Sequence, residues 1–207
     1  MIQLDTDMFY WINQHHCAFA DWMLWCASQH WSWAIVLLFF FFIGPMRYEP
    51  EKWWIVLIGI ALCFLLSDRI SVSCFKNVFC RLRPCHALPD VRMFRTSCGG
   101  MYGFVSSHAA NVGALAIFLI LRMRMAAKKY LISKSASKPR WALSFPSFSV
   151  LVAIWMMVVC YSRPYLGKHY PGDVICGAAV GMLLGTIVFL LIYLFENSHV
   201  INISKKK

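Results

Sequence analysis

Five long apolar stretches constrain this chain more than any other feature of its sequence. Each comes close to the roughly 20 residues that an α-helix needs to cross a bilayer core of about 30 Å. Hydrophobic residues make up 60% of the 207 residues and charged residues only 14%, whereas a soluble domain carries roughly 25% charge. This composition excludes a soluble enzyme and a disordered chain. The stretches are residues 23–43, 53–67, 105–121, 141–162 and 174–195.

We therefore expect an all-α fold, an integral membrane helical bundle with about five transmembrane helices in a single domain over residues 1–207. Residues 1–22 are predicted to be an interfacial N-terminus, because residues 7–17 are aromatic and weakly amphipathic. They contain no Lys or Arg, so they lack the basic start of a secretory signal, and we expect the chain to be kept whole. Residues 196–207 are predicted to be a basic cytoplasmic tail.

Basic residues are distributed unevenly between the two ends of the predicted bundle. Five crossings place 12 Lys and Arg on one side, in residues 44–52, 122–140 and 196–207, and 8 on the other. Cytoplasmic loops are enriched in these residues, so the first side is predicted to be cytoplasmic. Residues 68–104 and 163–173 then share the outer side. The net charge of +11 is explained by topology, and we expect no nucleic acid partner.

Three polar blocks interrupt the apolar pattern on the predicted outer side. In one-letter code they read K-x6-R-P from Lys76, V-S-S-H from Val105 and S-R-x5-H-x3-D from Ser162. In order and spacing they resemble the signature motifs of the type 2 phosphatidic acid phosphatase (PAP2) family, K-x6-RP, PSGH and S-R-x5-H-x3-D. The first and third match at every fixed position. In the middle block, Val105 replaces the family's proline and Ser107 its glycine. The resemblance covers residues 68–185, about half of the chain.

The residue types of these blocks suit a phosphate. Lys76, Arg83 and Arg163 would bring three fixed cations to one face, and arginine can hold phosphate oxygens with two parallel hydrogen bonds. Ser106 and Ser107 lie where the third crossing begins, so we expect backbone N–H groups and the helix dipole to point at the same anion. These five residues are the predicted phosphate-binding set.

The third block also suggests a nucleophile. A turn at Pro171-Gly172 would fold His169 back so that one ring nitrogen donates to Asp173 while the other faces phosphorus. His108, at a different helix end, is then available as the general acid for the departing lipid oxygen. His169, His108 and Asp173 are therefore the predicted catalytic residues. The resemblance implies the same roles, with a phosphohistidine intermediate and no metal or other cofactor. The sequence offers no clustered carboxylates of the kind that Mg²⁺ prefers.

The remaining polar residues receive a structural interpretation. Single charges in outer loops are usually solvated and contribute little, and Asp68 could pair with Arg69 or with a motif cation. The charges interpreted as solvated are Arg69, Arg81, Arg92, Arg95 and Lys168, and the histidines without an assigned role are His15, His16, His30, His86 and His199.

Small residues and cysteines give two further expectations. Gly177, Gly181 and Gly185 recur every fourth residue, which lets two membrane helices approach closely. We expect the fifth crossing to pack there against the third, through Ala109, Gly113 and Ala116. Cys85 could form a disulfide with Cys98 in an oxidising compartment, with Cys80 as a rival partner.

Together these features predict a bacterial-type lipid phosphatase in the inner (cytoplasmic) membrane, with its active site facing the periplasm and a phosphorylated membrane lipid as its partner. The resemblance implies undecaprenyl pyrophosphate, lipid A phosphates, phosphatidylglycerol phosphate and phosphatidic acid as substrates. We place them in the order undecaprenyl pyrophosphate, then lipid A 1- or 4'-phosphate, then the glycerolipids.

Other functions stay open at this point. A lipid phosphotransferase would keep every motif, and a non-catalytic lipid-binding relative would explain the altered middle block. Two other classes fit less well: a transporter would show inverted repeats, and the related vanadium haloperoxidases are soluble.

Overall fold

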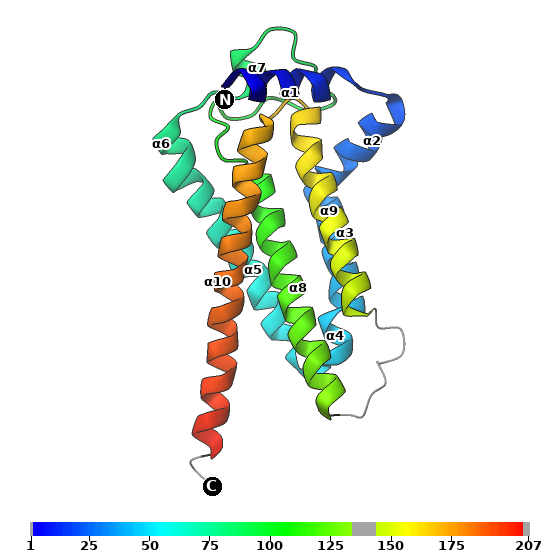
Figure 1. Cartoon of the computed structure of the whole chain (residues 1–207), viewed down its shortest axis with the longest axis vertical. Helices are drawn as coiled ribbons and strands as arrows, with labels where there is room; N and C mark the ends of the chain where they lie inside the picture. The colour runs from blue at the N-terminus through cyan, green and yellow to red at the C-terminus, as the bar shows by residue number, and fades with distance from the viewer. Residues whose placement is uncertain (1, 134–143, 205–207) are drawn as a thin grey trace.

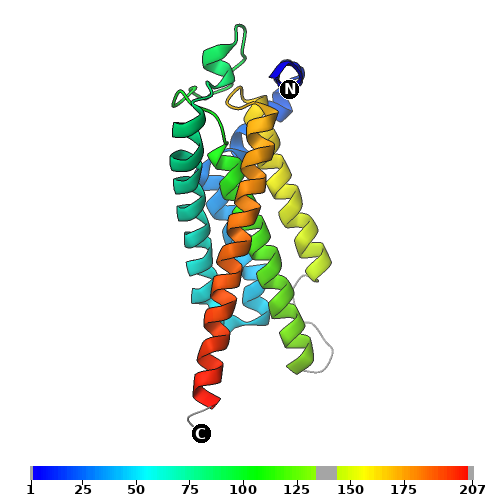
Figure 2. The same ribbon diagram turned by 60° about the vertical axis from the view of Figure 1, so that its left-hand side comes forward.

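The chain folds into a bundle of long α-helices. The structure, a computed structural model, describes residues 2–133 and 144–204, so residues 141–143 of the predicted fourth crossing and 205–207 of the predicted tail lie outside the described part. Within these two ranges, five helices are long and apolar enough to cross a membrane, and they run side by side (Figures 1 and 2). The all-α membrane fold is thereby confirmed. These spans are His30–Tyr48, Pro50–Phe79, Ser107–Ile132, Phe145–Tyr165 and Pro171–Ser198.

The N-terminal segment forms two helices, α1 (Ile2–Gln14) and α2 (Ala18–Ala27). Helix α1 lies across one end of the bundle in both views (Figures 1 and 2), as expected for a helix that lies flat on a membrane surface. Phe9 points into the protein and is buried, whereas Trp11 is exposed. The helix therefore has one face on the bundle and one face free.

The first predicted crossing, residues 23–43, was wrong as a single helix. Helix α2 ends at Ala27, and α3 (His30–Ile43) begins three residues later. The end of α2 is stabilised by side chains from α3: Ser32 Oγ donates to Cys26 O at 2.6 Å and Trp33 Nε1 to Ala27 O at 2.8 Å. These bonds satisfy carbonyls that a helix end leaves unpaired.

The second crossing is longer than the sequence predicted. After the short helices α4 (Pro45–Tyr48) and η1 (Pro50–Lys52), α5 (Trp53–Ile70) continues through the π-helical segment η2 (Ser71–Lys76) into α6 (Asn77–Phe79). The charges at Asp68 and Arg69 therefore do not end the helix, and the continuation carries Lys76 to the same end of the bundle as α1.

The third, fourth and fifth crossings are α8 (Ser107–Ser133), α9 (Phe145–Tyr165) and α10 (Pro171–Ser204). Helices α8 and α10 pack closely, as their small residues predicted: Gly177, Gly181 and Gly185 lie against the α8 backbone at Ser106, Ala110 and Ala114. A Cβ atom added at Gly177 would lie 2.6 Å from the carbonyl oxygen of Ser106, so no larger residue fits without a shift. Ala109 and Gly113 also belong to this interface.

A buried ion network joins three crossings at the opposite end of the bundle. Arg122 of α8 is only 1% exposed and donates to Glu49 at 2.8 Å and to Glu196 of α10 at 2.6 Å. Lys52, at the start of the second crossing, also pairs with Glu196, at 2.5 Å. Arg122 was predicted to be a loop charge, but burial and two carboxylate partners make it part of the core.

Candidate active site

The predicted site residues lie at the end of the bundle that α1 covers. Lys76 ends η2, His108 is in the first turn of α8, and Arg163 is in the last turn of α9. His169 lies in the loop between α9 and α10, and Asp173 in the first turn of α10. Residues up to 97 positions apart in the sequence are thus brought to the same end of the bundle (Figure 1).

Three cations of the site are fixed by neighbours from different segments. Lys76 Nζ donates to Ser107 Oγ at 2.7 Å. Arg83 donates through Nε and Nη1 to two backbone carbonyls, each at 3.2 Å. Arg163 is 2% exposed and donates to Ser28 Oγ at 2.6 Å, while its buried Nε has no hydrogen-bond partner among the described residues. The cations therefore retain donors that are not used within the protein.

His169 is buried among these cations and is 2% exposed. Burial, followed by the positive charges of Arg163 and Arg83, holds the pKa of His169 well below its usual range. The imidazole is therefore neutral at pH 7, as a nucleophile must be. Its Nδ1 lies 3.7 Å from Asp173 Oδ2 and has no hydrogen-bond partner among the described residues. This distance is longer than a hydrogen bond, so the expected donation to Asp173 is absent in this state.

Asp173 is fully buried and held by two other donors. Its Oδ2 accepts a hydrogen bond from the backbone N–H of Tyr170 at 3.1 Å, and this bond caps the start of α10. Its Oδ1 accepts a hydrogen bond from Arg81 Nη1 at 2.7 Å. The Asp173 carbonyl oxygen accepts the backbone N–H of Ser106 at 3.0 Å. The expectation that this Ser106 N–H points at an anion is therefore wrong, because it joins α8 to α10 instead. The Ser107 side chain, in contrast, is in contact with Lys76.

His108 is half-buried on the α3 side of the site. Its ring lies 5.3 Å from that of Trp33 and 5.5 Å from that of His30, measured between centroids. The break between α2 and α3 therefore places both His30 and Ser28 beside motif residues. Neither residue belongs to one of the three motif blocks.

Two charges interpreted as solvated were misjudged. Arg81 bridges Asp5 and Asp173, and Arg92 pairs with Asp21 through two bonds of 2.9 and 2.6 Å. Arg95 is exposed, as expected, and lies 4.3 Å from the centre of the Trp22 ring. In each case the partner lies more than 70 residues away in the sequence, so spacing could not reveal it.

Lys168 is a fourth cation of the cluster. It is half-buried, and its burial, together with the charges of Arg163 and Arg83, lowers its pKa to about 8. Its position directly before His169 is the sequence signal that could have identified it.

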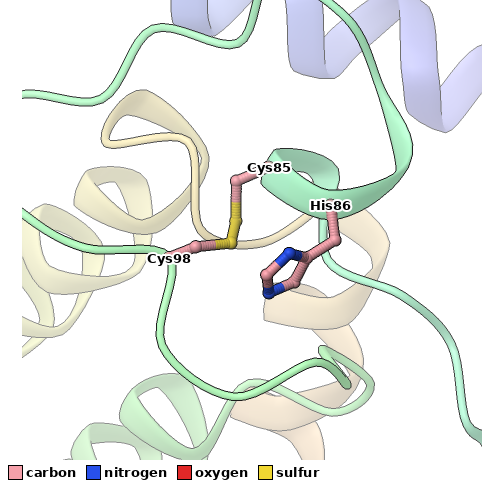
Figure 3. A group of neighbouring side chains, drawn as sticks. All are labelled: Cys85, His86 and Cys98. Atoms are coloured by element: carbon pink, nitrogen blue, oxygen red, sulfur yellow. A yellow bond between two sulfur atoms is a disulfide. The ribbon is translucent and has the colours of Figure 1, made fainter.

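The loop that carries Arg83 is closed by a disulfide between Cys85 and Cys98, whose Cα atoms are 5.9 Å apart, which resolves the choice against Cys80. Figure 3 shows His86 beside the two bonded sulfurs. Among the described residues, Cys85, His86 and Cys98 are the one group with the spacing of metal ligands. The disulfide removes the thiolates that would bind a metal.

An apolar cavity of about 910 Å³ adjoins the site under α1. Asp5 and Arg81 form its polar edge, next to Asp173. Its apolar wall is formed by helices α1, α6 and α10 and by the loop that precedes α8. The wall includes Leu4, Met8, Phe79, Phe104 and Ile175.

Comparison with known proteins identifies this arrangement. The chain matches the family model of the PAP2 superfamily over residues 52–196. It is 29% identical to a lipid A 4'-phosphatase of Porphyromonas gingivalis over 205 residues, which cover 96% of this chain and 77% of the relative. It is 28% identical to a lipid A 4'-phosphatase of Bacteroides thetaiotaomicron, covering 91% of this chain and 76% of the relative.

Two crystal structures share the fold. Aquifex aeolicus LpxE aligns with a TM-score of 0.57 and 20% identity, over 89% of this chain and 94% of that one. A PAP2-type phosphatidylglycerolphosphate phosphatase from Bacillus subtilis aligns with a TM-score of 0.61 and 16% identity, over 95% of this chain and 86% of that one.

Proposed function

The chain belongs to the PAP2 superfamily, and from this premise we propose that it is a membrane phosphatase that removes the 4'-phosphate of lipid A. One observation carries the catalytic part of the proposal: a buried, neutral His169 is surrounded by the charges of Arg163, Arg83 and Lys76. Such a cluster suits an anion with nearly two negative charges, and a neutral imidazole beside it can attack phosphorus.

The proposed reaction has two steps. His169 Nε2 attacks phosphorus, and the bond between phosphorus and the lipid oxygen breaks. His108, protonated once the negative phosphate is bound beside it, gives its proton to that oxygen. Water then attacks the phosphohistidine, and His108 takes up a proton from this water. The P–N bond breaks and inorganic phosphate is released. Lys76, Arg83 and Arg163 stabilise the charge on the equatorial oxygens in both steps, with Ser107 beside them on Lys76.

The substrate order differs from the one that the sequence suggested. The sequence-based order began with undecaprenyl pyrophosphate. The two bacterial relatives that align over most of their length, however, are lipid A 4'-phosphatases. The apolar cavity beside the cation cluster supports an amphiphilic substrate. The tails of a bound lipid could enter this cavity while its phosphate contacts the cations.

We further propose that the site faces the periplasm of a bacterial inner membrane. The basic residues counted above favour the opposite end as cytoplasmic. The Cys85–Cys98 disulfide lies in the loop that carries Arg83, and disulfides persist in oxidising compartments such as the periplasm. Two independent features thus support the same orientation.

The substrate is tested with purified protein in detergent and a panel of lipid A, undecaprenyl pyrophosphate, phosphatidylglycerophosphate and phosphatidic acid. We expect the fastest release of inorganic phosphate from lipid A, with mass spectrometry showing a product that keeps its 1-phosphate. Faster turnover of undecaprenyl pyrophosphate, or loss of the 1-phosphate, would refute this assignment. Transfer of the phosphate to a second lipid would identify a phosphotransferase instead.

A further inference from the structure

Asp5 of α1 is connected to the catalytic end of α10 through a chain of charged groups. Asp5 Oδ1 accepts the backbone N–H of Gly172 at 2.7 Å, and its Oδ2 accepts from Arg81 Nη2 at 2.7 Å. Arg81 Nη1 donates to Asp173 Oδ1, also at 2.7 Å. The other oxygen of Asp173 is the one that lies 3.7 Å from His169. A continuous path therefore leads from the N-terminal helix to the proposed nucleophile.

The charges along this path need one another. Asp173 is fully buried, and a buried carboxylate without a cation is strongly unfavourable. Arg81 supplies that cation and also lies 4.0 Å from the centre of the Tyr170 ring, which fixes its plane. Asp5 pairs with the other Nη atom of Arg81. The negative charge of Asp5 is in turn stabilised by the N-terminus of α10. Each group thus restricts the orientation of the next.

We propose that Arg81 and Asp5 are positioning residues, which hold the Asp173 carboxylate behind His169 and make α1 a part of the catalytic assembly. This inference rests on the proposed function of His169. Neither residue needs to touch the phosphate. Both Nη atoms of Arg81 already donate to carboxylates, and Arg81 lies on the Asp173 side of the imidazole.

Two kinetic constants separate this role from phosphate binding. Loss of a partner that orients a catalytic group typically costs about 10- to 100-fold. We expect Arg81→Ala and Asp5→Asn to lower kcat by about this factor with KM changed less than about 2-fold, because the substrate contacts stay in place. Arg81→Lys should recover part of kcat, since it keeps a charge next to Asp173.

Gly172→Ala tests the same path without removing a charge. A Cβ atom at Gly172 would lie 2.9 Å from Asp5 Oδ2, so the added methyl group should displace the Asp5 carboxylate and lower kcat. Asp7→Asn is the matched control on α1, because Asp7 is exposed and contacts Gln3 of its own helix. We expect its kcat to equal that of the wild type.

Four results would overturn the inference. A rise in KM at unchanged kcat in Arg81→Ala would make Arg81 a phosphate ligand. Unchanged kcat in Asp5→Asn would disconnect α1 from the site. Losses that follow the folded fraction in thermal unfolding, with no recovery in Arg81→Lys, would leave only a structural role. A wild type that is inactive on every lipid phosphate would refute both proposals. If the wild type instead acts on a lipid other than lipid A, the proposed substrate is wrong, and the kcat values of the variants are compared on that lipid.

Discussion

At the scale of single residues, burial among cations sets the protonation of Lys168 as it does that of His169. Lys168 has a pKa of about 8, so the side chain is positively charged below that pH and neutral above it. If it contributes to phosphate binding, kcat/KM should fall as the pH rises through about 8, by about 10-fold for one charge-assisted contact.

Two variants check this prediction in pH profiles between about 6 and 10. Lys168→Arg should keep its charge and extend activity to higher pH. Lys168→Gln should have low kcat/KM already at pH 7 and a smaller step near pH 8 than the wild type. An alkaline step of wild-type size in Lys168→Gln would show that another group causes it.

The candidate site residues divide by how far apart their partners lie in the sequence. His169, Asp173 and the motif cations follow the local spacing of the family's motifs, so residue types and this resemblance were enough to propose them. Arg81 looked like an isolated charge because its partners, Asp5 and Asp173, lie 76 and 92 residues away. Contacts of this kind, between a loop residue and two helices, are set by packing, which spacing does not encode.

At the scale of helices, hydropathy predicted the number of crossings and their order, but not their ends. Charges at Asp68 and Arg69 suggested a helix end, whereas the helix continues to Phe79. Both side chains are exposed, and a long side chain can extend along a helix to polar surroundings. The break between α2 and α3, in contrast, was not predicted. It depends on side chains of α3 that bond to carbonyls of α2.

The ion network around Arg122 gives a prediction about stability. Removal of one partner from a buried ion pair typically costs about 3–5 kcal/mol, so Arg122→Ala should lower the free energy of unfolding by about that amount. Thermal unfolding in detergent measures the effect. Glu51→Gln is the control, since Glu51 is exposed in the same segment as Glu49. Equal unfolding temperatures for Arg122→Ala and the wild type would show that the network contributes no stability.

At the scale of the whole molecule, the proposed orientation predicts which end of the bundle is accessible from outside. The seven free cysteines would first be replaced by alanine, leaving the Cys85–Cys98 disulfide, which does not react with maleimides. In spheroplasts, a membrane-impermeant maleimide should label Gln14→Cys at the end of α1 and not Lys128→Cys on α8. Both positions are exposed, so burial would not explain a difference.

Labelling of position 128 with protection of position 14 would invert the protein. The phosphatase site would then face the cytoplasm, and lipids presented at the outer leaflet would be excluded as substrates.

This fold brings a neutral histidine and a cation cluster together, and we propose that they hydrolyse a lipid phosphate. Phosphate release from lipid A by purified wild type and His169→Ala tests this proposal. His86→Ala serves as the matched histidine control, because His86 is exposed and outside the cluster. We predict that the wild type and His86→Ala release phosphate at equal rates while folded His169→Ala falls to background. A His169→Ala variant that unfolds at the wild-type temperature and still releases phosphate at a comparable rate would contradict the account.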